Sequence, residues 1–135
     1  MTPVILHVAG LLTTALLFGG MLLFAGGFAA FLFTALPPEA ARRLIRQAFP
    51  PFYVFVIMTA LTAALLVVQE DPLSAVVLAT IAVTTLPTRQ ILMPAINQAT
   101  DSGRRRRFAW LHGLSVLITL AHIATAGTVL VWLAL

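Results

Sequence analysis

The sequence predicts an all-α membrane protein, a bundle of four transmembrane helices. Of its 135 residues, 61% are hydrophobic and only 9% are charged, and the mean hydropathy is +1.05. A water-soluble domain with this composition would expose far too much apolar surface. Four apolar runs follow one another, each long enough to cross a bilayer as a helix. Alternating strands are absent from the sequence, so helices are the remaining way to satisfy the backbone inside lipid.

The expected helices cover residues 3–36, 49–68, 73–92 and 108–135. Prolines stand near several of their ends, where a missing N–H costs least and the preceding residue is biased away from helix; these are Pro37, Pro38, Pro50, Pro51 and Pro72. The first run exceeds the bilayer thickness, which predicts that this helix tilts or projects beyond the membrane. Because no repeat or low-complexity linker divides the chain, we expect a single integral membrane domain over residues 1–135.

Charge at the helix ends predicts the orientation. The two connections at one end are basic, with Arg42, Arg43 and Arg46 in one and Arg104, Arg105, Arg106 and Arg107 in the other. The connection at the opposite end contains Glu70 and Asp71 and no base. Since short arginine-rich loops stay in the cytoplasm, both of these loops should be cytoplasmic and both termini outside. This pattern indicates a bilayer partner and no nucleic acid, and we expect the bacterial cytoplasmic membrane as the location.

Small residues four apart predict where helices approach one another closely. In the first helix these are Ala15 with Gly19 and Gly26 with Ala30; in the last they are Ala121 with Thr125 and Ala124 with Thr128. Two interpretations remain open. The small faces pack inside one chain, or they form the seam of a homo-oligomer or a contact with a larger membrane complex.

Several short motifs resemble one family. They are Val4-Ile5-Leu6-His7, Phe24-Ala25-Gly26-Gly27-Phe28, Thr34-Ala35-Leu36-Pro37, Gln47-Ala48-Phe49-Pro50-Pro51-Phe52-Tyr53 and Phe108-Ala109-Trp110-Leu111-His112-Gly113-Leu114-Ser115. These stretches resemble the transmembrane protein 205-like family, a group of four-helix membrane proteins of unsettled function. Arg89 followed by Pro94 is similar to an element of that family's third helix, although its spacing departs from the pattern. The resemblance implies a fold and a membrane location more than an activity.

Polar groups at one depth suggest a ligand site. Tyr53, Arg89 and His112 each lie about 5 to 6 Å inside the cytoplasmic boundary of their expected helices, and ionisable groups at membrane depth are costly and often functional. If they face inward, they form a candidate ligand-binding cluster together with Asn97, Gln98, Asp101 and Ser115. The alternative is that arginine and tyrosine anchor the helices at the interface and that the histidine is merely tolerated there.

His7 and His122 raise the question of haem b or copper. A near-terminal histidine followed by a Gly-Gly pair is loosely similar to copper-resistance and haem-binding four-helix membrane proteins, and facing histidines hold haem in bundles. However, His7 lies about 6 Å and His122 about 15 Å inside the outer boundary, whereas ligands of one iron need nearly equal depth. Each histidine could instead be satisfied by a carbonyl or a threonine. The methionines that could bind copper are otherwise core fillers; they are Met21, Met58 and Met93.

Other chemistry is largely excluded by the sequence. There is no cysteine, no glycine-rich phosphate loop and no metalloprotease or serine-hydrolase motif. All acids fall in expected loops, so no carboxylate pair is available inside the bundle for acid–base work. We therefore expect a non-enzymatic protein that handles a small ligand or metal at the polar cluster. The alternatives are an accessory subunit of a larger membrane complex and a haem-b electron carrier that uses His7 and His122.

Overall fold

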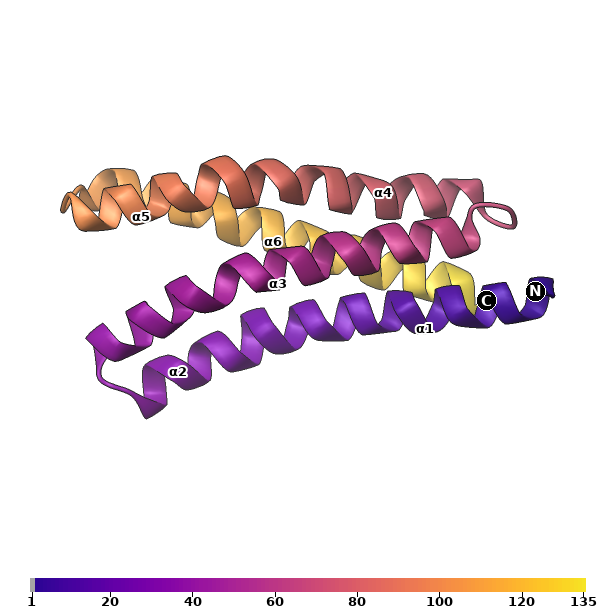
Figure 1. Cartoon of the computed structure of the whole chain (residues 1–135), viewed down its shortest axis with the longest axis horizontal. Coiled ribbons are helices and arrows are strands. Elements are labelled where there is room, and N and C mark those ends of the chain that lie inside the picture. Colours follow the sequence, from indigo (N-terminus) through magenta and orange to yellow (C-terminus); the bar gives the residue numbers. More distant parts are fainter. Residues whose placement is uncertain (1) are drawn as a thin grey trace.

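The computed structural model describes residues 2–135, and within this range the chain is helical without strands. The chain crosses the length of the molecule as four rods, Pro3–Ala35, Pro38–Val67, Pro72–Asp101 and Arg105–Ala134, each long and apolar enough to span a membrane. The all-α, four-helix prediction is therefore confirmed. Figure 1 shows the rods running side by side along the long axis.

The first rod consists of α1 (Pro3–Leu22), a π-helical segment η1 (Leu23–Phe28) and α2 (Ala29–Ala35). It ends because Leu36 adopts an extended conformation in front of Pro37, as residues before proline prefer. The π-helical segment contains a Gly-Gly pair, Gly26 and Gly27.

The second rod, α3 (Pro38–Val67), begins well before the expected Phe49 and contains Pro50 and Pro51 in its interior. The expectation that these prolines mark a helix boundary is wrong. Pro38 occupies the first turn, where its missing N–H costs nothing, and the following segment is rich in strong helix formers such as Ala, Glu, Arg and Leu. The carbonyls that the proline pair leaves without donors belong to exposed residues near the arginine end, where water or headgroups can solvate them.

The third rod also continues past its expected end at Leu92. It consists of α4 (Pro72–Pro87), a π-helical segment η2 (Thr88–Leu92) and α5 (Met93–Asp101). Pro94 falls in the first turn of α5, directly after the π-helical segment, so its missing N–H coincides with a local change of hydrogen-bond register. The rod ends at Gly103, whose φ of 65° provides a left-handed helix stop.

The turn before the third rod is organised by Asp71, the N-cap of α4. Its carboxylate accepts hydrogen bonds from the Ser74 hydroxyl at 2.5 Å and the Ser74 backbone N–H at 3.0 Å. These two hydrogen bonds, the hydroxyl first, hold the pKa of Asp71 below its usual value. The cap therefore fixes the start of α4 through an ionised carboxylate.

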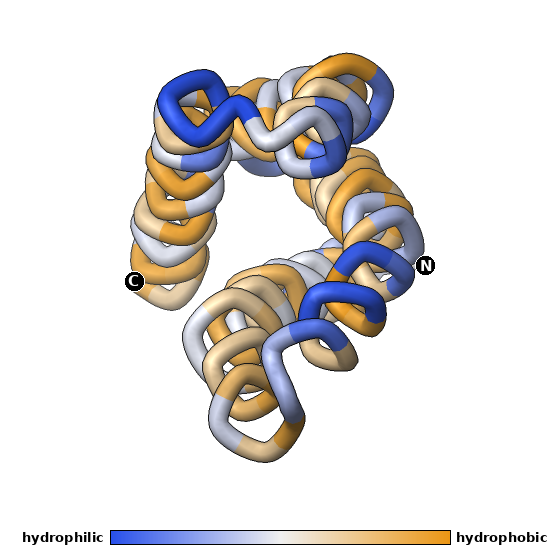
Figure 2. The backbone as a smooth tube through the Cα atoms, turned by 90° about the vertical axis from the view of Figure 1, so that its left-hand side faces the viewer, coloured by the Kyte–Doolittle hydropathy of each residue, from blue (hydrophilic) through white to orange (hydrophobic). Residues whose placement is uncertain are grey.

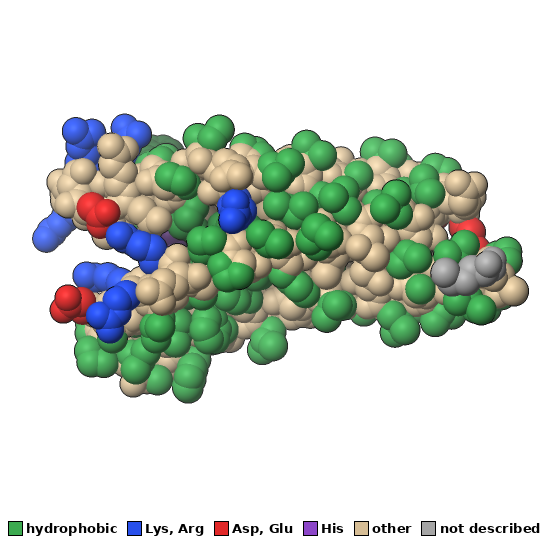
Figure 3. Space-filling view, viewed as in Figure 1, with side chains coloured by type: hydrophobic (Ala, Val, Ile, Leu, Met, Phe, Trp, Pro, Cys, Tyr) green, Lys and Arg blue, Asp and Glu red, His purple; other side chains and the backbone are tan. Residues whose placement is uncertain are grey.

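The fourth rod is α6 (Arg105–Ala134), which begins slightly before the expected Phe108 because the arginines form its first turn. It packs against α1, α4 and α5, while α3 packs against α1 and α4, so the rods form a closed ring. Both termini and the turn at Glu70 lie at one end of the bundle (Figure 1). The arginine groups lie at the other end, which we call the arginine end (Figure 3).

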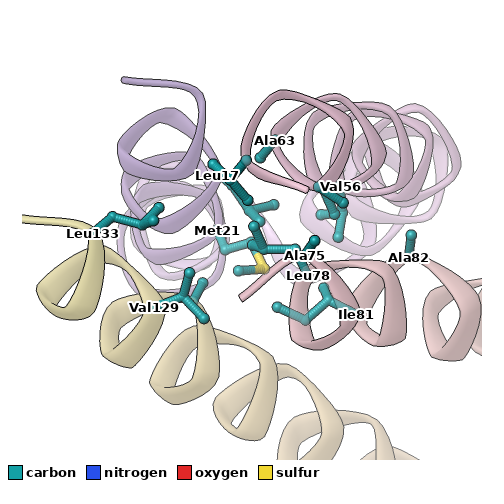
Figure 4. Close-up of a cluster of buried hydrophobic side chains, with 14 of the residues drawn as sticks. Leu17, Met21, Val56, Ala63, Ala75, Leu78, Ile81, Ala82, Val129 and Leu133 are labelled. Atoms are coloured by element: carbon teal, nitrogen blue, oxygen red, sulfur yellow. The ribbon is translucent and has the colours of Figure 1, made fainter. Parts of the chain in front are cut away.

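The core occupies the half of the bundle nearest the termini. Figure 4 shows its side chains, which come from all four rods and include Leu17, Met21, Val56, Leu78 and Val129. Leu17, Leu78 and Val129 are fully buried. Helix contacts here are close, because a Cβ at Gly20 would lie 2.6 Å from the Phe55 ring.

The outward surface of the rods is apolar. Leu12, Leu65 and Leu117 are exposed at 64%, 75% and 64%, and similar side chains cover the flank of the molecule in Figure 3. Exposed apolar patches of this extent are rare on soluble monomers. The surface and the four long apolar helices make this an integral membrane protein in contact with lipid.

Candidate ligand-binding site

A cavity of about 620 Å³ lies in the arginine half of the bundle, opposite to the core. Its walls come from all four rods: η1 and α2, the first turns of α3, α5, and α6 from Phe108 to Ile123. It forms because α2 diverges from α6, whereas α1 packs against α6 (Figure 1). Its mouth is a notch between the two groups of charged side chains at the arginine end (Figure 3).

The wall from the first rod contains a run of small residues between Leu22 and Phe33. Gly26, Ala29 and Ala30 all line the cavity. A Cβ at Gly26 would meet no atom within 4 Å. The small side chains at these positions therefore leave space in which a ligand fits. Larger apolar residues, including Phe33, Phe49, Met93 and Ile123, complete the walls.

The wall from α6 carries a polar stripe, which we define as His112, Ser115 and Thr119. Their spacing of three and four residues places them on one face of the helix. The His112 ring stacks on Phe108, with centroids 5.3 Å apart and planes at 7°. Asn97 and Thr100 face the stripe from α5. The cavity thus offers hydrogen-bonding groups along an otherwise apolar space.

The mouth of the cavity is positively charged. Arg46 forms a two-pronged ion pair with Asp101, at 2.9 Å and 3.3 Å, which links α3 to α5. Arg42 also lines the cavity and is exposed, and within residues 2–135 it has no ion-pair partner. Arg42 is therefore the guanidinium at this mouth that an incoming anion can reach without displacing a carboxylate.

The structure divides the cluster expected from the sequence. Asn97, His112 and Ser115 line the cavity. Tyr53 lies behind the wall and is 3% exposed, with the Ser115 side chain near its hydroxyl. In this chain Ser115 therefore stands between the cavity and the buried tyrosine.

Arg89 lies outside the cavity, so Tyr53, Arg89 and His112 do not converge. Its Nε donates to the carbonyl of Pro50 at 3.3 Å, and its side chain is half-buried against α3. A helical carbonyl keeps a second lone pair that can accept a further hydrogen bond, and the Arg89 guanidinium supplies the donor here. Arg89 thus ties the third rod to the second rod.

The family model described as "Domain of unknown function (DUF4149)" matches residues 12–105. The chain belongs to the DUF4149 family. The match covers most of the first three rods and ends at the first residue of α6. No curated protein and no solved structure matches the chain.

The two histidines considered for haem have separate partners in this DUF4149 protein. His7 Nδ1 lies 3.2 Å from Glu70 Oε2, and His122 Nε2 lies 2.8 Å from Thr84 Oγ1. Because Thr84 donates its own proton to the Thr80 carbonyl at 2.7 Å, it accepts from His122. Glu70 and Thr84 are separated by about 20 Å along the third rod. Within residues 2–135 no group of three or more metal-binding side chains comes together.

The methionines are equally dispersed in the DUF4149 chain. Met21 is buried in the core and Met58 is exposed at 58%, whereas Met93 lines the cavity. These positions provide no shared thioether site for copper.

The small residues predicted to pack helices fall in unexpected places. A Cβ at Gly19 or Gly26 would meet nothing within 4 Å, Ala30 and Thr128 are exposed, and Thr125 is half-buried. The close approaches within this DUF4149 chain occur at Gly10, Gly20 and Gly127. The spacing of small residues identifies a helix face that lacks bulk, but it does not say whether that face points to a neighbouring rod, because this depends on which rods become neighbours.

Residues that sequence reasoning missed are Arg42, Arg46 and Thr119, all of which line the cavity. Thr119 could have been found, since it continues the helical face of His112 and Ser115 by four residues. For Arg42 and Arg46 the sequence predicts only the side of the membrane, because the pattern around them is typical of a loop.

Proposed function

We propose that this protein binds a small anionic amphiphile in the cavity, with the anionic group at Arg42 and the apolar part along the walls. The observation that carries the proposal is the form of the cavity. Its volume of about 620 Å³ is typical of small-molecule sites. From Phe108 to Ile123 it follows α6 for about 22 Å, which suits an elongated molecule. The charge is concentrated at one end of this space.

The chemistry of the walls favours binding over catalysis. The polar stripe and Asn97 supply neutral hydrogen-bonding groups, and Arg42 supplies fixed positive charge. Three of the four acids are engaged: Asp101 is bound by Arg46, Glu70 by His7 and Asp71 by Ser74. The fourth, Glu39, lies in the first turn of α3 and does not line the cavity. A carboxylate or a phosphate is therefore the group that the mouth recognises, as in other arginine sites.

Two of the motifs that resemble the transmembrane protein 205-like family lie at the cavity. Phe24-Ala25-Gly26-Gly27-Phe28 forms η1 with one further residue of the same π-helical segment, and the stretch from Phe108 to Ser115 forms the start of α6. Both border the cavity. We infer that these two motifs, which resemble those of that family, form part of the ligand-binding site.

Binding can be measured by displacement of a fluorescent fatty acid from the protein purified in detergent. The competitors are oleate, oleoyl lysophosphatidic acid and monoolein, which share one chain and differ in the headgroup. The two anions should displace the probe more strongly than neutral monoolein. Arg42→Gln should weaken the anions about tenfold or more, because a charge-assisted hydrogen bond contributes about 1.5–3 kcal/mol, and it should leave monoolein unaffected.

The matched control is Arg43→Gln, which removes an equal charge from the neighbouring exposed position outside the cavity. It should leave the affinities unchanged. Equal losses in the two variants would reduce the effect to general surface charge and overturn the proposal, as would failure of every competitor to displace the probe. The ranking of oleate against lysophosphatidic acid distinguishes a carboxylate from a phosphate ligand.

We further propose that the arginine end faces the cytoplasm, so that ligand enters from the inner leaflet of the bacterial cytoplasmic membrane. The chain has no cysteine, so single-cysteine variants report one site each. In intact cells an impermeant maleimide should label Leu135→Cys and should label Ser102→Cys only after permeabilisation. Labelling of Ser102→Cys in intact cells, with Leu135→Cys protected, would reverse the orientation.

A further inference from the structure

The Tyr53 hydroxyl is a buried polar group without a partner. The side chain is 3% exposed, and its Oη has no hydrogen-bond partner within residues 2–135. Ser115 faces it without meeting hydrogen-bond geometry. A buried hydroxyl left unpaired destabilises the folded state, so a partner is expected at this position.

A second, smaller cavity lies beside this hydroxyl. Its volume is about 10 Å³, and Tyr53, Thr119 and His122 line it together with Thr85 and Thr88. A space of this size accommodates about one water molecule, which needs two to four polar partners to bind stably. The polar lining distinguishes it from a gap between apolar side chains, which would remain dry.

Most polar groups in this lining already have partners. Thr85 donates to the Ile81 carbonyl at 2.7 Å and Thr88 to the Thr84 carbonyl at 3.0 Å. His122 uses Nε2 for Thr84 at 2.8 Å, which leaves Nδ1 as an acceptor. The groups that remain are the Tyr53 hydroxyl, the Thr119 hydroxyl and the second nitrogen of His122.

We propose that one water molecule is bound at this site and joins the Tyr53 hydroxyl to Thr119 and His122. A water can donate twice and accept twice, so it can satisfy the tyrosine and still bond to the other two groups. Thr119 lines both the small cavity and the large one, which gives water a route from the arginine end. The proposal does not rest on ligand binding in the large cavity.

The consequence is a polar connection through the middle of the bundle. The stripe of His112, Ser115 and Thr119 extends through the water to His122, and from there to Thr84 on α4. The water adds the second rod, through Tyr53, to the direct hydrogen bond between Thr84 and His122 of the third and fourth rods. This links α3, α4 and α6 at the inner limit of the large cavity.

The sign of the effect of Tyr53→Phe on thermal stability tests the site in the full-length protein in detergent. If the water is bound, this variant loses the hydrogen bond between the Tyr53 hydroxyl and the water, and the apparent melting temperature falls by roughly 2–5 °C. If the site is dry, the variant removes an unsatisfied hydroxyl, and the melting temperature stays equal or rises. A fall supports the proposal, and an equal or raised value overturns it.

Two further variants separate water from a direct contact. With bound water, Tyr53→Phe and Thr119→Val are non-additive, since both act on the same water. If Tyr53 instead bonds directly to Ser115 after a small shift, Ser115→Ala is coupled to Tyr53→Phe and Thr119→Val is not, which overturns the proposal. Thr85→Val is the control, because its hydroxyl is bound to its own helix and it should be additive with Tyr53→Phe.

Discussion

Replacing Gly26 by leucine is expected to abolish binding of the anionic amphiphile while the protein remains folded. Gly26 lines the cavity, and a Cβ there would meet no atom within 4 Å. Its backbone φ lies outside the left-handed region, which within residues 2–135 only Gly103 adopts, so leucine causes no backbone strain. The isobutyl group would occupy the space that the ligand's apolar part needs, and affinity should fall more than tenfold.

The matched control for this prediction is Gly19→Leu. Gly19 also offers open space to a Cβ, but it does not line the cavity. In the fluorescent fatty acid assay, Gly19→Leu should bind as the unmodified protein does. Unchanged binding by a folded Gly26→Leu variant would show that the cavity is not the site.

Replacing Gly10 by alanine is expected to destabilise the bundle strongly. Gly10 is buried on α1, and a Cβ there would collide with Cγ1 of Val67 on α3. Val67 is 1% exposed and its β-branched side chain is stiff, so it cannot move aside easily. Overpacking of this kind costs typically about 1–3 kcal/mol. Denaturant or thermal unfolding in detergent measures it.

Gly19→Ala provides the comparison, because it makes the same chemical change on the same helix where no atom lies within 4 Å. Alanine has the higher helix propensity, so this variant should be as stable as the unmodified protein or slightly more stable. Equal stability of Gly10→Ala and Gly19→Ala would show that α1 and α3 do not approach closely at this level.

The number of rods and the end at which arginines gather could be predicted, whereas two helix boundaries could not. Hydropathy counts spans well because the bilayer demands continuous apolar length. Proline is an ambiguous signal, since it is equally compatible with a first helical turn, as at Pro38, and with an interrupted interior, as at Pro50 and Pro94. Whether the helix continues depends on where the freed carbonyls find partners, which is a property of the fold.

For the candidate site, some of the lining residues could be predicted, whereas their depth and direction could not. His112, Ser115 and Asn97 do line one cavity, because residues at similar depth on neighbouring rods have some chance of meeting. Arg89 is expected at the same depth only if the third helix ends near Leu92; the rod continues to Asp101, and the Arg89 side chain turns toward the Pro50 carbonyl. Successive side chains point about 100° apart around the helix axis. In a rod that is apolar on nearly all sides, the sequence says little about which side chains face the interior of the bundle.

The confinement of the core to one half of the bundle has a mechanical consequence. The half near the termini is densely packed around Leu17, Leu78 and Val129, and packed interiors resist compression. The half at the arginine end contains the cavity and is spanned at its mouth by the exposed ion pair of Arg46 and Asp101, a weak link in water. Figure 2, viewed from this end, shows the rods arranged around a common centre. Lateral pressure from the surrounding bilayer should therefore displace the rods more at the arginine end than near the termini, where the packed core holds them together.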